Sequence, residues 1–286
     1  MKRAVVLGGG GPVGVAWELG VLAALAESGI DARAADLMVG TSAGSVVGAQ
    51  VGHGRDPSAL LAERRAAPAQ PSGEGAPSAV PADAAGVFAL WVSATEMTQA
   101  HAAQIGALAL QARTMPEEQW VASFAANGWP GWPEQHLVLT AVECESGAFR
   151  AIDRASGVPI ERAVAASCAV PGLFPPVTVD GVRCMDGGVR SGTSADLAQR
   201  IEPDVVLVVA PIGWAGRGIH RLAALQLAQE IGALEAAGAR VRLIEPDDGA
   251  RAHMGNLMDP AEALPAADAG YAHARRLAAG LRTWWG

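Results

Sequence analysis

A serine surrounded by small residues is the first candidate for chemistry. Ser42 lies within residues 40–44, which read Gly-Thr-Ser-Ala-Gly, between an apolar run at 37–39 and an expected helix over 45–51. A serine on a sharp turn between strand and helix is lifted clear of the sheet, and the helix N-terminus places N–H groups beside its oxygen. The pattern predicts that Ser42 is a nucleophile. The alternative is an ordinary turn in which Ser42 caps the helix.

A nucleophilic serine needs a base. In an α/β-hydrolase the base is a histidine near the C-terminus, and His253 and His273 lie late enough in the chain to be considered. None of the six histidines lies in a recognisable motif; they are His53, His101, His136, His220, His253 and His273. Before the apolar run that leads into Ser42, the sequence also places only one clear strand, whereas α/β-hydrolases usually have several strands there.

A glycine-rich loop is the second candidate. Residues 9–14 read Gly-Gly-Gly-Pro-Val-Gly, between an expected strand at 4–7 and an expected helix over 15–27. The loop fits the dinucleotide pattern Gly-x-Gly-x-x-Gly, but Asp36 begins the second strand instead of ending it, and Pro12 has no N–H to offer a pyrophosphate. Consecutive glycines at a helix N-terminus also suit an oxyanion hole, where unhindered N–H groups stabilise a tetrahedral intermediate.

Two further segments complete a pattern. Residues 166–177 read Ala-Ser-Cys-Ala-Val-Pro-Gly-Leu-Phe-Pro-Pro-Val, and residues 186–188 read Asp-Gly-Gly. With the glycine loop and the serine before them, they make the sequence resemble the patatin-like phospholipases, a family marked by these four motifs in this order. The resemblance covers about residues 1–66 and 135–210.

The resemblance implies a serine–aspartate dyad without a histidine. Ser42 would be the nucleophile, Asp186 the general base, and Gly9, Gly10 and Gly11 the oxyanion donors. It further implies a three-layer α/β/α sandwich and hydrolysis of acyl esters through an acyl-enzyme, with no metal and no other cofactor.

The sequence departs from the family pattern at two places. The family usually carries Arg or Lys just before the last glycine of the loop, where this chain has Val13 after Pro12. The asparagine often found a few residues after the Asp-Gly-Gly triplet is also absent, and Thr193 and Ser194 stand there. The hydrolase class is therefore better supported than a preference for phospholipids.

The order of the other elements favours one α/β domain over residues 1–286. Apolar runs predict further strands at 137–142, 149–152, 177–179, 182–185, 205–210 and 241–245, with a helix over 219–237 and a helical C-terminus. Asp180 and Gly181 form a two-residue hairpin signal, and the same Asp-Gly turn is the alternative reading of Asp186.

Residues 67–133 interrupt this order and are expected to form a helical cap. Residues 67–82 are rich in Pro, Ala and Gly and predict a flexible hinge or loop. Helices are expected within 82–113 and from 114 to 128, where Thr114 and Glu117 have capping-box spacing. Aromatic residues of this segment would line an acyl-chain pocket or lid, or pack only within the cap; they are Trp91, Trp120, Phe124, Trp129 and Trp132.

Composition limits the partners. The net charge of −8 argues against a nucleic-acid ligand, so the expected partner is a lipid or small acyl ester, with any membrane contact peripheral and through the apolar cap. Cys144, Cys168 and Cys184 lack metal or disulfide spacing and are expected to be buried. No signal peptide or membrane-spanning run is visible, so a cytoplasmic location is expected; the oligomeric state is not indicated.

Three other functions fit parts of this pattern. An acyltransferase would use the same Ser42 and Asp186 and differ only in the acceptor of the acyl group. A dinucleotide-binding protein would use the glycine loop and tolerate loss of Ser42. A lipid-binding module would keep an apolar pocket without reacting.

Overall fold

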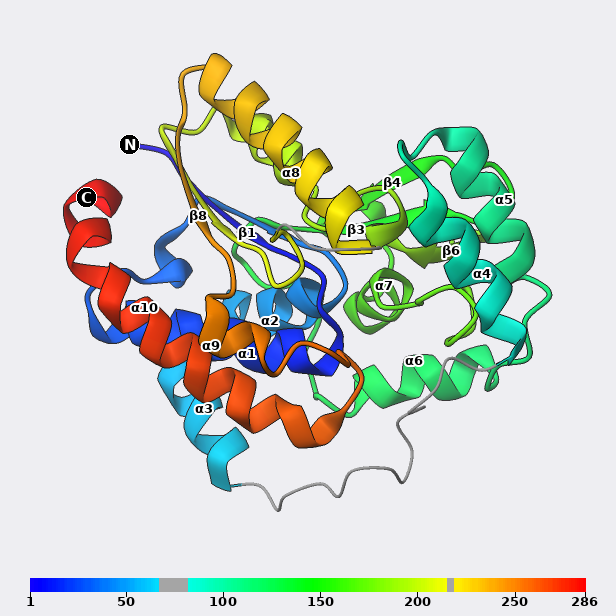
Figure 1. The fold of residues 1–286 in the computed structure, drawn as a ribbon, viewed down its shortest axis with the longest axis horizontal. Helices are drawn as coiled ribbons and strands as arrows, with labels where there is room; N and C mark the ends of the chain where they lie inside the picture. Colours follow the sequence, from blue (N-terminus) through cyan, green and yellow to red (C-terminus); the bar gives the residue numbers. More distant parts are fainter. Residues whose placement is uncertain (67–81, 215–218) are drawn as a thin grey trace.

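The computed structural model describes residues 1–66, 82–214 and 219–286. Its centre is an eight-stranded sheet of order β5-β6-β3-β2-β1-β7-β8, with β4 paired to β3 (Figure 1). The strands are β1 Arg3–Leu7, β2 Leu37–Gly40, β3 Leu137–Glu143, β4 Phe149–Ile152, β5 Val177–Val179, β6 Val182–Asp186, β7 Val205–Val209 and β8 Arg240–Ile244. Each lies within one or two residues of its predicted range.

Strands β3, β2, β1 and β7 and the edge strand β8 are parallel, whereas β4, β5 and β6 join in antiparallel pairs. In β1 the side chains alternate between two apolar clusters, with Val5 and Leu7 on one face and Ala4 and Val6 on the other. Both faces are covered by helices at the centre of the sheet, so β1, β2 and β7 are almost wholly apolar in sequence, whereas the edge strand β8 is not.

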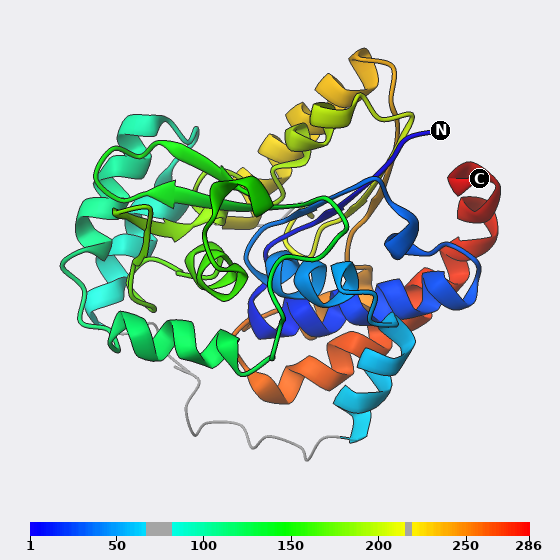
Figure 2. The ribbon, with the colours of Figure 1, turned by 180° about the vertical axis from the view of Figure 1, so that it is seen from behind.

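One face carries the helices that begin at the two glycine-rich turns (Figures 1 and 2). They are α1 Gly11–Glu27 and α2 Ala43–Gly52, joined on this side by α3 Pro57–Ala66, α7 Ile160–Ser167 and the C-terminal α10 Ala263–Trp285. Helices α1 and α10 pack so closely that a Cβ atom on Gly20 would lie 2.0 Å from the Ala267 carbonyl oxygen.

The opposite face is covered by α8 Ile219–Ala236 and the 3-10 helix η4 Ala195–Ile201. Together the two helical layers and the sheet form the predicted three-layer α/β/α sandwich. The remaining short elements are η1 Ala32–Ala34, η2 Arg154–Ser156, η3 Gly187–Val189, α9 Asp248–Arg251 and η5 Pro260–Glu262.

The expected cap is divided between the two faces of the sheet. Helices α4 Ala82–Ser93 and α5 Gln99–Ala109 pack beside β3 and β6 through buried residues such as Trp91 and Ile105. Helix α6 Glu117–Ala125 instead lies on the other side, next to α7 (Figure 2). The hinge predicted at 67–82 falls outside the described residues, apart from Ala82, which begins α4.

The capping box predicted at Thr114 is wrong. Helix α6 begins at Glu117, and Pro116 precedes it with no side-chain cap. The Thr114 hydroxyl donates to the neighbouring Met115 carbonyl at 3.3 Å. Glu117 does not complete the capping box, because its carboxylate binds Arg162 and Thr178 on other elements.

The predicted hairpin at Asp180 and Gly181 is confirmed, with φ values of 51° and 79° at its two central residues. All three cysteines are free and buried, and burial raises the pKa of the Cys144 and Cys184 thiols to about 12. Among the described helices, none is long and apolar enough to cross a bilayer.

Candidate active site

Ser42 occupies a strained turn at the carboxyl end of β2. Its φ and ψ are 51° and −114°, outside the common regions for a residue with a side chain, and α2 begins at the next residue. A Cβ atom on Gly44 would lie 2.1 Å from the Leu7 carbonyl oxygen, and one on Gly40 would lie 2.7 Å from the Gly44 oxygen. Only glycine fits at these two positions, so the small residues around Ser42 are required by the turn.

The turn is held by the C-terminal end of α7 and the residue that follows it. The Ser42 N–H donates to the Ser167 hydroxyl at 3.0 Å, and the Cys168 thiol donates to the Ser42 carbonyl at 3.2 Å. The Ser45 hydroxyl donates to the same carbonyl at 2.6 Å. Residues 167 and 168 belong to the third sequence motif, and their contact with the serine turn gives that motif a positioning role.

Asp186 is the last residue of β6 and lies beside Ser42. The side chain is 2% exposed; its Oδ1 accepts a 2.7 Å hydrogen bond from the Gly188 N–H. Its Oδ2 is buried and makes no aligned hydrogen bond within the described part of the chain. The Ser42 side chain is nevertheless close enough to interact with the carboxyl and lower its pKa. The structure thus brings together two side chains that lie 144 positions apart in the sequence.

Burial dominates the titration of Asp186. Loss of solvent raises the pKa of the carboxyl to about 7, and the contacts with Ser42 and the Gly188 N–H oppose that rise. A carboxylate with this pKa is a stronger base than an exposed one and is still substantially ionised at neutral pH. The pair can therefore transfer a proton from the serine to the aspartate.

Close backbone packing fixes Asp186 against the neighbouring strand. The Asp186 N–H donates to the Ala169 carbonyl at 2.9 Å. A Cβ atom on Gly187 would lie 2.1 Å from the Thr140 hydroxyl oxygen of β3. That hydroxyl donates to Thr41 Oγ1 at 2.9 Å, next to Ser42. A chain of contacts through two strand ends therefore sets the distance between Asp186 and Ser42.

The glycine loop lies against the serine, but its N–H groups are not equivalent. A Cβ atom on Gly9 would lie 3.5 Å from that of Ser42, yet the Gly9 N–H already donates to the Gly192 carbonyl at 2.8 Å. The N–H groups of Gly10 and Gly11 donate no backbone hydrogen bond to any described residue. In this conformation Gly10 and Gly11 are free to act as donors, and Gly9 is not.

The start of α1 is a poor fit to a dinucleotide. The Val13 N–H donates to the Leu257 carbonyl at 3.2 Å and the Gly14 N–H to the Gly10 carbonyl at 2.7 Å. Pro12 has no N–H. A pyrophosphate needs several donors at this helix end, and two remain. The arrangement suits a single oxygen atom better.

A cavity of about 250 Å³ opens at Ser42. Residues from the starts of α1 and α2, from α3 and α6, from the segment after α7 and from the 255–259 loop line it: Gly11, Pro12, Val15, Ser42, Ala43, Val46, Arg64, Trp120, Phe124, Cys168, Val170, Phe174 and Met258. Trp120 stacks on Phe174 with ring centroids 3.9 Å apart and meets Phe124 edge-on at 4.8 Å. The wall is therefore aromatic.

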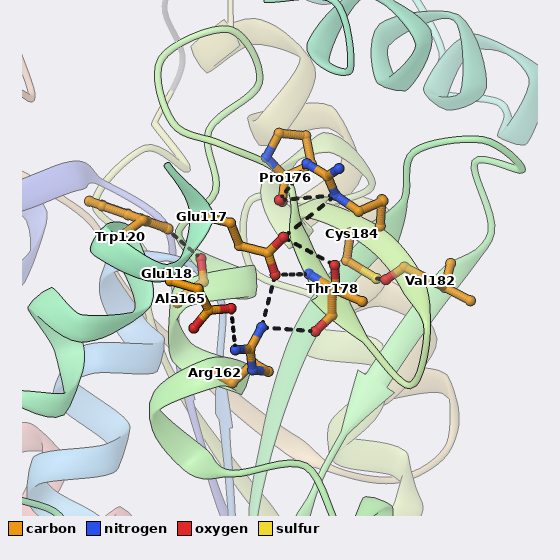
Figure 3. A network of polar contacts seen from close by, with 10 residues as sticks. Glu117, Glu118, Trp120, Arg162, Ala165, Pro176, Thr178, Val182 and Cys184 are labelled. Carbon is orange, nitrogen blue, oxygen red and sulfur yellow. Dashed lines mark hydrogen bonds and ion pairs between the residues drawn. The ribbon is translucent and has the colours of Figure 1, made fainter. Parts of the chain in front are cut away.

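Polar contacts anchor that wall to the core (Figure 3). Glu117 at the start of α6 accepts hydrogen bonds from Arg162 of α7 at 2.8 Å and from the Thr178 N–H of β5 at 2.7 Å. The Trp120 indole N–H donates to the Ala165 carbonyl at 3.0 Å. These bonds hold α6 beside α7 and so place Trp120 in the wall of the cavity that Ser42 also lines.

The other predicted candidates lie elsewhere. His253 pairs with Glu262 at 2.7 Å, and burial lowers the pKa of His273 on α10. No histidine is among the described residues that line the cavity. Of the five aromatic residues of the expected cap, Trp120 and Phe124 line it, whereas Trp91, Trp129 and Trp132 pack in apolar clusters.

A strained serine turn, a buried carboxyl and an apolar cavity thus lie together at the carboxyl ends of the strands. The family model described as "Patatin-like phospholipase" matches residues 5–198, more than half of the chain. The chain belongs to the patatin-like phospholipase family, a family of lipid acyl hydrolases.

Two solved structures with a similar fold are VipD and ExoU. VipD from Legionella pneumophila is 13% identical with a TM-score of 0.45, and the alignment covers 98% of this chain and 67% of that one. The type III effector ExoU is 17% identical with a TM-score of 0.37, covering 96% of this chain and 53% of ExoU. The chain thus spans only about half of ExoU. No curated protein matches the sequence significantly.

Proposed function

We propose that this protein hydrolyses acyl esters of lipids through an acyl-enzyme on Ser42, with Asp186 as the general base. The observation that carries the proposal is the strained Ser42 turn beside a 2%-exposed carboxyl whose pKa is raised to about 7, facing an apolar cavity. The nucleophile, its base and the space for an acyl chain are then all in one place.

The reaction follows from this geometry. Asp186 accepts the hydroxyl proton while Ser42 Oγ attacks the ester carbonyl carbon. The tetrahedral intermediate collapses, the C–O bond to the alcohol breaks, and the alcohol leaves with the proton from Asp186. Asp186 then takes a proton from water, whose oxygen attacks the acyl-enzyme, and returns it to Ser42 as the carboxylic acid leaves.

The N–H groups of Gly10 and Gly11 stabilise the oxyanion of each intermediate in this proposal. They are the free donors of the loop, and each such donor typically contributes about 3–4 kcal/mol to the transition state. Gly9 has a different role from the one expected from sequence, since its bond to Gly192 holds the loop against Ser42.

The acyl chain is proposed to lie against Trp120, Phe124 and Phe174. These rings supply most of the apolar wall, and Trp120 is fixed by its bond to Ala165. The volume of about 250 Å³ is below the roughly 300 Å³ at which drug-sized sites begin, so the cavity suits one short chain or the reactive end of a longer one.

Hydrolysis of 4-nitrophenyl hexanoate and of a monohexanoyl glycerol tests the proposal. We expect turnover by the wild type and loss of about 10³-fold or more in kcat/KM for Ser42→Ala and Asp186→Asn. His253→Gln and His273→Gln serve as controls and should stay within about twofold, because neither histidine lines the cavity. Loss of activity in a histidine variant, or full activity in Ser42→Ala, would contradict the mechanism.

The same assay separates hydrolysis from acyl transfer. Acyl transfer uses the same two residues, so the product decides. With excess glycerol or a primary amine present, a hydrolase releases mainly free hexanoate, whereas an acyltransferase forms mainly the new ester or amide. We expect free hexanoate.

A further inference from the structure

One cation lines the Ser42 cavity. Arg64, in the last turn of α3, is the single charged side chain among the described residues of the cavity wall. The rest of the wall is apolar, apart from Ser42 and the Cys168 thiol. A charge placed in apolar surroundings needs a physical reason, because its desolvation is unfavourable.

Arg64 has no partner among the described residues that would supply this reason. Its Nε atom is buried and donates no hydrogen bond, and the side chain makes no ion pair with any described residue. Burial also lowers the pKa of its guanidinium. Arg64 as a whole is partly buried. Arginines withdrawn from water are ordinarily paired with an acid, so one that lines a cavity without a partner among the described residues is available to a ligand.

The next residue on the same helix shows the contrast. Arg65 is exposed, pairs with Asp268 at 2.6 Å and lies over the Tyr271 ring at 5.5 Å. It does not line the cavity. The two adjacent arginines thus differ: Arg65 is paired with α10, whereas Arg64 lines the cavity of Ser42 and has no partner in the described part of the chain.

We propose that Arg64 binds an anionic oxygen group of the substrate, a phosphate or a carboxylate, so that the preferred substrate is a single-chain acyl ester that carries one such group. The inference rests on the proposed function. A guanidinium has five N–H donors in a planar fork that fits both kinds of anion and stays charged at neutral pH. Because the cavity is only about 250 Å³, the anion and the ester must be close together in the substrate.

Matched substrate pairs test this proposal. One pair is 1-hexanoyl glycerol and 1-hexanoyl glycerol 3-phosphate, and the other is 4-nitrophenyl hexanoate and the mono-4-nitrophenyl ester of adipic acid. For each pair the quantity measured is the ratio of kcat/KM between the anionic and the neutral ester. This ratio is independent of how much of the enzyme is folded.

The wild type is expected to prefer the anionic member of at least one pair by about 10- to 100-fold, the usual effect of a hydrogen bond to a charged group. Arg64→Met should bring the ratio close to one, and Arg64→Lys should keep part of it, because the charge remains without the fork. The matched control Arg65→Met should keep the full wild-type ratio. The pair that shows the preference identifies the anion as a phosphate or a carboxylate.

Calorimetry gives a readout without catalysis. Ser42→Ala protein should bind hexyl phosphate or hexanoate more tightly than 1-hexanol, and the added Arg64→Met change should remove that difference. Ser42-dependent hydrolysis without any anionic preference, or a preference that survives in Arg64→Met, would overturn this inference alone. Absence of Ser42-dependent hydrolysis of all four esters would overturn the proposed function, and calorimetry would still show whether Arg64 binds anions.

Discussion

Strand β6 has the same dipeptide, Asp-Gly, at each end, and the two copies have different surroundings. Asp180 and Gly181 precede the strand in an exposed hairpin turn, where the Asp180 side chain is 48% exposed and pairs with Arg150 at 3.1 Å. Asp186 and Gly187 end the strand; the Asp186 side chain is 2% exposed beside Ser42.

The comparison shows that surroundings, rather than residue type, give the second aspartate its chemistry. At the hairpin, both residues have positive φ, which Asp tolerates and Gly allows, and the carboxylate remains in water. At the other end, the carboxyl is enclosed and its pKa rises to about 7. The same dipeptide forms a turn in one place and supplies the proposed base in the other.

The largest expected difference is in catalysis. Asp186→Asn removes the base while keeping the shape, and kcat/KM for 4-nitrophenyl hexanoate should fall by about 10³- to 10⁵-fold. Asp180→Asn should stay within about twofold of wild type, because asparagine also tolerates the left-handed turn. Equal losses of kcat/KM in the two variants would contradict the different roles given to the two ends of β6.

The pH profile of kcat/KM should report Asp186. The carboxylate is the reactive form, so activity should be full above the raised pKa and fall as the pH decreases through about 7, approaching tenfold per pH unit well below it. Asp180→Asn should leave this profile in place. A midpoint near 4, the ordinary range for an exposed aspartate, would contradict the role given to burial.

Substitutions of the two glycines that follow these aspartates should also differ in their effects on stability and activity. Gly187→Ala places a Cβ atom 2.1 Å from Thr140 Oγ1, and we expect a loss of about 1–3 kcal/mol in unfolding free energy together with most of the activity. Gly181→Ala has open space but a φ of 79°, so it should lose about 1–2 kcal/mol and keep its kcat/KM within about twofold. Chemical denaturation and the ester assay measure both quantities.

The last expected effect is on thermal stability and does not involve catalysis. Since the folded pKa of Asp186 is raised, protonation favours the folded state, and this contribution is present below the unfolded pKa near 4 and lost as the pH rises through about 7. At pH 8 the unfolding free energy of the neutral Asp186→Asn variant should therefore exceed that of the wild type by up to about 4 kcal/mol. Its unfolding temperature should be several degrees higher. The difference should vanish near pH 4, and Asp180→Asn should show no such trend.

Features of the fold with a local cause could be predicted from the sequence. Strands such as β1 and β7 are continuous apolar runs, and the hairpin at Asp180 needs two residues with positive φ. The Ser42 turn was equally visible, because its neighbours must be small for the helix to start so close to the strand.

Features that depend on distant partners could not. The Gly9 N–H is taken by Gly192, and the start of α1 is covered by Leu257, both far away in the sequence. Thr114 and Glu117 have the spacing of a capping box, but Arg162 and Thr178 compete for Glu117. Arg64 gave no local signal, because only the tertiary fold places it at the cavity.

Covalent labelling of the wild type by a fluorophosphonate at pH 8, followed by mass spectrometry of the digested protein, tests the central claim most directly. The account predicts one adduct on Ser42, none at that site in Ser42→Ala, labelling slower by about 10³-fold in Asp186→Asn, and wild-type speed in Asp180→Asn. An unlabelled wild type, an adduct on a different residue, or equal slowing by the two aspartate variants would contradict it.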